Sequence, residues 1–124
     1  MAKQATDKTA VRMASLDTLM KSLSGGNQQR AMLSRWLLAG PRVAIFDEPT
    51  RGVDVGAKDD IYLLVGQLAE DGLACVFISS ELSELTITCD RVLALYEGHV
   101  LGELLGAEIT DSALGALVVG AHLK

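Results

Sequence analysis

The stretch Val43-Ala44-Ile45-Phe46-Asp47-Glu48-Pro49-Thr50 decides the fold. Its first four residues are apolar, a run typical of a parallel strand that helices bury on both faces. Pro49 cannot extend a hydrogen-bond ladder, so the strand ends there and leaves Asp47 and Glu48 at its carboxyl end. Ligands of open α/β sheets bind at this edge. An aspartate there can hold Mg²⁺, and a second carboxylate can orient or deprotonate a water molecule. The alternative is a strand end with solvated acids.

Two further stretches flank this strand. Upstream lies Leu23-Ser24-Gly25-Gly26-Asn27-Gln28-Gln29-Arg30, and downstream lies Arg51-Gly52-Val53-Asp54-Val55-Gly56-Ala57-Lys58. In this order the three stretches resemble the signature loop, Walker B strand and D-loop of the ATP-binding cassette (ABC) transporter ATPases. The forms LSGGNQQ and DEPTRGVDVGAK resemble the second cassette of the ATP-binding subunits of ribose, xylose and galactose importers. The resemblance runs from roughly Val11 to Val118 and implies an α/β fold, part of a P-loop NTPase cassette.

Composition narrows the class of protein. A chain of 124 residues makes one domain at most. Its net charge of −5 argues against a nucleic-acid partner. No apolar run approaches the ~18 residues that span a bilayer, and the N-terminus lacks a secretory signal. Cys75 and Cys89 lack zinc-site spacing and are predicted to be reduced thiols of a cytosolic protein.

The signature-like stretch predicts a helix with Ser24 as its N-cap and an end at Gly40. Apolar residues at helical spacing are Met32, Leu33, Trp36 and Leu37. This pattern predicts that Trp36 lies in the core, while Arg30 and Arg35 lie off the apolar stripe.

A helix N-terminus attracts phosphate through unpaired N–H groups and a partial positive charge. The resemblance implies that the signature loop binds ATP in trans, held by another cassette of a head-to-tail dimer. The residues of this loop are Ser24, Gly25, Gly26, Asn27 and Gln28. Ser24, Gly26 and Asn27 would contact the γ-phosphate. Asn27 replaces the usual glutamine, as is typical of the sugar-importer branch. The alternative is an ordinary capped helix.

Asp54 is predicted to cap a second helix, and it matches the D-loop aspartate that reaches across the dimer interface. The expected buried stripe is Ala57, Ile61, Leu64, Val65 and Leu68. The resemblance also implies that Asp47 binds Mg²⁺ and that Glu48 is the catalytic Walker B glutamate.

A second buried strand is expected at Ala74–Ser79, parallel to the first. The position of the family's switch histidine is Ser80, which cannot supply the charge or reach of an imidazole. A short helix at 81–88 should lead to an antiparallel hairpin that turns at Glu97-Gly98, and a last helix should start near Thr110.

The sequence contains no G-x-x-x-x-G-K-[ST] motif, the loop that cradles nucleotide phosphates. Residues 11–124 are therefore expected to form the C-terminal portion of an ABC ATPase domain, after a disordered leader at 1–10. The phosphate-loop strand would be missing, so the sheet should have a hole or its strands should close up.

The leading hypothesis is a fragment of the ATP-binding subunit of a carbohydrate importer, inactive alone. ATP and Mg²⁺ would bind only in the assembled dimer of cassettes. Its partners would be a cassette with an intact Walker A motif, the membrane permease subunits and, indirectly, a periplasmic sugar-binding protein, at the inner face of the plasma membrane. Nucleic acid is not expected as a partner. Alternatives are a catalytically silent interaction or regulatory module, a truncated gene product, and a complete ATPase acting alone.

Overall fold

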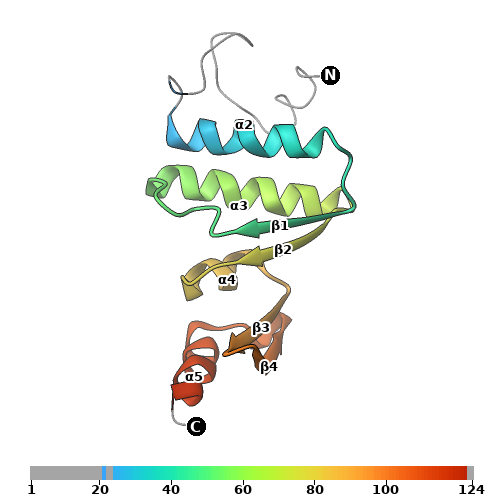
Figure 1. Cartoon of the computed structure of the whole chain (residues 1–124). Helices are drawn as coiled ribbons and strands as arrows, with labels where there is room; N and C mark the ends of the chain where they lie inside the picture. The colour runs from blue at the N-terminus through green and yellow to red at the C-terminus, as the bar shows by residue number, and fades with distance from the viewer. Residues whose placement is uncertain (1–20, 22–23, 123–124) are drawn as a thin grey trace. The chain divides into compact units, whose positions relative to one another are not determined.

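A computed structural model describes residue 21 and residues 24–122, which form two compact units that divide between Ile78 and Ser79 (Figure 1). The leader expected at residues 1–10 lies outside the described residues. No helix in the described part of the chain is long and apolar enough to cross a membrane.

The first unit has a parallel pair of strands. Strand β1 (Val43–Asp47) pairs with β2 (Ala74–Ile78), and Val43 lies opposite Ala74. Helix α3 (Val55–Glu70) connects the strands, and helix α2 (Gly25–Leu37) lies beside α3 (Figure 1). This is the parallel strand–helix–strand arrangement that the sequence predicted.

The core of this unit lies between α3 and one face of the strands. Its buried members are Phe46, Ile61, Leu64, Val65 and Leu68. Ile61 is fully buried, and the four α3 residues repeat at helical spacing, as predicted. Leu33 and Leu37 of α2 pack against the edge of this core.

The prediction that β1 is buried on both faces is wrong. Helices cover one side of the strand pair, where Phe46 is 4% exposed, while Ile45 on the other side is 67% exposed. The neighbouring strand alternates in the same way, with Val76 and Ile78 exposed. A continuous apolar run does not reveal how many of its faces are covered within its own unit.

Trp36 is also not a core residue, because 71% of its surface is exposed. The buried residues of α2 are Gly26, Arg30 and Ser34. These recur every fourth residue and face α3, so the close helix–helix contact decides which side of α2 is covered. Of the predicted apolar stripe, Leu33 and Leu37 pack against the core, whereas Met32 and Trp36 are exposed.

The second unit is an antiparallel hairpin with two helices. Its elements are α4 (Leu82–Thr88), β3 (Arg91–Tyr96), β4 (His99–Leu105), the 3₁₀ turn η2 (Gly106–Glu108) and α5 (Asp111–His122). Glu97 and Gly98 turn the hairpin with φ of 47° and 79°, the left-handed region that a two-residue turn requires. Leu114 of α5 is 2% exposed. Strands β1–β2 and β3–β4 form separate two-stranded sheets.

Candidate functional site

The N-termini of α2 and α3 border one polar cavity of about 230 Å³ in the first unit. Figure 1 shows the two helices side by side, both starting on the left. The cavity is lined by Ser24, Gly26, Asn27, Arg30, Asp54, Ala57 and Asp60. Two helix N-termini open on the same space and add partial positive charge to that of Arg30, while the carboxylates of Asp54 and Asp60 add negative charge.

A side chain caps each helix, as the sequence predicted. The Asp54 carboxylate accepts the Ala57 backbone N–H at 3.0 Å, and the Ser24 hydroxyl oxygen accepts that of Asn27 at 3.5 Å. These bonds satisfy backbone donors that the first turn of each helix would otherwise leave unpaired. The two capping residues therefore mark the rim of the cavity.

Asn27 makes a second bond to the same serine. Its side-chain Nδ2 donates to the Ser24 Oγ at 3.0 Å. The Ser24 oxygen thus accepts two N–H groups, and a hydroxyl oxygen has two lone pairs. The hydroxyl proton of this exposed serine is left to donate outward, to solvent or to a bound anion.

Two residues that sequence analysis did not select complete the cavity. Arg30, which is 7% exposed, forms an ion pair with Asp60 of α3. The sequence placed Arg30 off the apolar stripe of its helix, and nothing in the local pattern links it to an aspartate thirty residues later. Only the packing of α2 on α3 brings them together.

Asp47 and Glu48 lie at the carboxyl end of β1, as predicted. The Glu48 N–H donates to the Ile78 carbonyl oxygen at 2.9 Å, which continues the pairing with β2 for one residue. Glu48 has a φ of 46°, in the left-handed region that costs a non-glycine residue free energy. This turn leaves Asp47 exposed and Glu48 half-buried at the strand end.

A hydrogen bond ties the loop after β1 to α2. The Gln29 side-chain Nε2 donates to the Pro49 carbonyl oxygen at 2.7 Å. The next residue, Thr50, is 1% exposed. The first unit therefore holds the turn after Glu48 against the helix that begins at the polar cavity.

Asp47 and Glu48 could hold a Mg²⁺ ion only if a nucleotide supplied further ligands. Within residues 24–122 there is no group of three or more His, Cys, Asp or Glu side chains placed to hold a metal. Mg²⁺ is commonly bound by one or two carboxylates together with phosphate oxygens and waters. The exposed Asp47 can serve as such a carboxylate, provided that a nucleotide supplies further oxygens.

Ser80 belongs to the second unit and follows β2. The preceding hydroxyl, that of Ser79, donates to Glu84 Oε2 at 2.7 Å and accepts the Glu81 backbone N–H at 3.0 Å. Glu84 is 1% exposed, so the turn is anchored to a buried carboxylate. This arrangement presents Ser80 to solvent.

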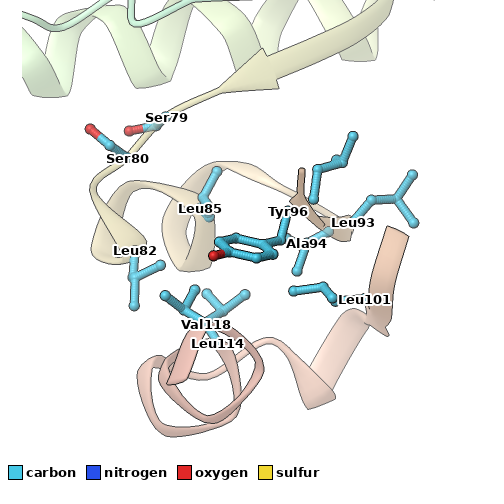
Figure 2. Close-up of a pocket in the computed structure, with 12 residues that line it drawn as sticks. Ser79, Ser80, Leu82, Leu85, Leu93, Ala94, Tyr96, Leu101, Leu114 and Val118 are labelled. Carbon is cyan, nitrogen blue, oxygen red and sulfur yellow. The ribbon is translucent and has the colours of Figure 1, made fainter. Parts of the chain in front are cut away.

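Ser79 and Ser80 also lie at one end of a second cavity, of about 420 Å³ (Figure 2). Figure 2 shows the Tyr96 ring among aliphatic side chains that include Leu85, Leu101 and Leu114. Its lining contains no charged side chain. Such a surface suits apolar atoms and does not favour phosphate.

The fold and the polar cavity agree with a nucleotide-binding α/β ATPase, and the comparisons define the class. The family described as ABC transporter matches residues 2–51. The matched range includes residues 2–10, where the motifs gave no resemblance. The chain matches part of the ATPase domain of ABC transporters.

Among individual proteins, the chain is similar to sugar import ATP-binding proteins. It is 45% identical to the ribose import ATP-binding protein RbsA 1 of Mesorhizobium japonicum, over 91% of this chain and 22% of that protein. It is 46% identical to the ribose import ATP-binding protein RbsA 2 of Streptomyces coelicolor, over 98% of this chain and 23% of that protein. The chain thus spans less than a quarter of the length of these relatives.

Solved structures show the same fold. An ATP-binding cassette of an ABC transporter superposes with a TM-score of 0.84 at 24% identity, over 99% of this chain and 49% of that one. A dimeric bacterial ABC transporter cassette gives a TM-score of 0.70 at 26% identity, over 84% of this chain and 45% of that one. The predicted fold class, a partial ABC cassette with parallel strands and a C-terminal hairpin, is confirmed.

Proposed function

We propose that the chain is part of the ATP-binding subunit of a carbohydrate ABC importer, where it supplies a phosphate-facing loop to ATP held by another cassette. The polar cavity at the joint N-termini of α2 and α3 carries this proposal. The similarity to ribose import ATP-binding proteins supports the choice of a carbohydrate importer.

Each residue of the loop has a physical part in this proposal. The Ser24 hydroxyl donates to a terminal phosphate oxygen, and Asn27 holds it in that orientation. Gly25 has open space around its Cα, so a phosphate can approach the backbone closely. Gly26 packs the loop onto α3, and Gln28 belongs to the first turn, whose N–H groups produce the partial positive charge. Asp54, at the cavity rim, is the residue that would reach the other cassette.

The carboxylates would serve the chain's own nucleotide side. Asp47 would hold Mg²⁺ together with phosphate oxygens, and Glu48 would orient or deprotonate a water molecule. Mg²⁺, when bound, neutralises charge on the phosphates. Ser80 replaces the histidine of the family, so this side is proposed to be weak. Ser80 is also the observation that favours the second candidate function, a catalytically silent interaction or regulatory module.

The proposed assembly implies which proteins the chain contacts and where in the cell it works. A second cassette with an intact phosphate-binding loop would hold the ATP, and membrane permease subunits would dock the pair at the inner face of the plasma membrane. A periplasmic sugar-binding protein would act indirectly through the permease. Binding of ATP and Mg²⁺ would require the assembled dimer of cassettes.

A segment exchange tests the proposal. In the ribose import subunit of Mesorhizobium japonicum, this chain would replace the matching 113 residues. The chimera should restore ribose uptake to cells that lack the subunit, whereas a subunit without the segment should not. The isolated chain should show no micromolar affinity for Mg-ATP in calorimetry. A correctly folded chimera that gives no uptake would reject the importer role, and the silent module would then be favoured.

A further inference from the structure

Arg30 and Asp60 form an ion pair between the second turns of α2 and α3, after the two helix caps. Gly26 and Ala57 form the first contact between α2 and α3, and Arg30 and Asp60 follow one helical turn later on the same faces. All four residues line the polar cavity, together with Ser24 and Asp54 at its rim. The pair therefore joins the two helices one turn beyond the loops that begin them.

The two members of the ion pair differ in burial. The Arg30 side chain is 9% exposed and that of Asp60 is 48% exposed. A buried guanidinium is costly unless hydrogen bonds and an opposite charge compensate for it. The Asp60 carboxylate thus compensates the buried positive charge of Arg30, and movement of α2 away from α3 would separate the two charges.

We infer that Arg30 and Asp60 are positioning residues that lock the N-termini of α2 and α3 together, so that the 24–27 loop and Asp54 move as one body. The assignment of these two loops to ATP rests on the proposed function. In that setting a shift of Ser24 towards or away from a phosphate is transmitted directly to the residue that faces the other cassette. Neither Arg30 nor Asp60 needs to touch the nucleotide for this role.

The lock can be tested on the isolated chain by measuring hydrogen exchange at the Asn27 and Ala57 backbone amides, which the two capping residues bind. The variants are Arg30→Glu, Asp60→Arg, the swapped double variant with both changes, and the milder Asp60→Asn. Each single reversal should speed hydrogen exchange at both the Asn27 and Ala57 backbone amides by about tenfold, equivalent to about 1.4 kcal/mol of coupling. The swapped double variant should restore most of the protection, because it recreates the pair with reversed polarity.

Matched controls carry the same charge changes at exposed neighbours, Arg35→Glu on α2 and Asp59→Arg on α3. They should leave both cap amides unchanged. Amides in the middle of α3, at Leu64 and Val65, should keep their protection in all variants that fold. If a single reversal prevents folding, Asp60→Asn supplies the comparison, with faster exchange expected at both caps.

Three results would overturn the inference. In the first, the cap amides of the swapped double variant exchange as fast as those of the single variants. In the second, the control variants speed exchange at the cap amides as much as the single reversals do. In the third, the amides of Leu64 and Val65 lose as much protection as the cap amides. The last result would mean that the pair only stabilises the fold. This readout needs no nucleotide, so it separates the two proposals. Restored protection in the swapped double variant, together with a chimera inactive in uptake, rejects the proposed function and keeps the lock.

Discussion

Gly26 and Ala57 pack so closely that a Cβ atom added to Gly26 would lie 2.8 Å from the Ala57 Cβ. Real Cβ atoms do not approach so closely, so any side chain at position 26 must push α2 away from α3. This contact sets the distance between the two helix N-termini that border the polar cavity. Gly26 is therefore a packing residue in addition to its place in the phosphate-facing loop.

Substitution of Gly26 should consequently cost stability where substitution of its neighbour does not. Gly26→Ala is expected to lower the free energy of unfolding by about 1–3 kcal/mol through overpacking. Gly25→Ala, which meets open space, should be neutral or stabilising by up to about 1 kcal/mol, because alanine is the better helix former. Urea unfolding of the two variants measures the difference, and equal stabilities would show that α2 can move away at no cost.

The strained backbone at Glu48 makes a second prediction. A β-branched side chain in the left-handed region is costly, whereas asparagine tolerates it. Glu48→Val should lower the free energy of unfolding by about 1–2 kcal/mol relative to Glu48→Asn. Asp47→Val is the matched control: it removes a carboxylate from the adjacent strand position, where valine is favoured, and should cost little. Equal melting of the valine and asparagine variants at 48 would contradict a strained turn.

Burial raises the pKa of the Cys75 thiol, so the folded chain contains less thiolate than the unfolded chain at the same pH. In a Cys89→Ser background, alkylation of Cys75 by iodoacetamide near neutral pH should be slower for the folded chain than in urea. The difference should narrow as the pH rises through the folded-state pKa. Through the same shift, this group stabilises the fold below the unfolded-state pKa, and that contribution is lost as the pH rises. Equal alkylation rates would argue against burial of the thiol.

Local rules predicted much of the fold. Ser24 and Asp54 act as helix caps because a cap depends on residues three positions apart. The buried stripe of α3 followed from apolar spacing, and the hairpin followed from Glu97-Gly98. These features depend on chain neighbours, so the sequence pattern contains them.

Packing between distant segments could not be predicted in this way. The buried side of α2 carries Arg30 and Ser34, and its largest apolar residue, Trp36, is exposed. The prediction from residue polarity placed Trp36 in the core and Arg30 outside it. Arg30 is buried instead, because Gly26 brings α2 close to α3 and Asp60 compensates the charge of Arg30. The motifs identified the candidate loop from resemblance, but the lock beneath it required the geometry of both helices.

The final prediction separates the two halves of the proposed chemistry. Ser24 would face ATP held by the other cassette, while Glu48 would serve a side weakened by Ser80. A bulky cation at position 24 would fill the cavity rim and block closure on the phosphate. In the chimeric subunit, Ser24→Arg should abolish sugar-stimulated phosphate release in membrane vesicles, whereas Glu48→Gln should leave a substantial part of it. Gln67→Arg, which adds the same side chain at an exposed position of α3, should have no effect. If Glu48→Gln is the more damaging change, this chain's own side hydrolyses ATP and the asymmetry is wrong.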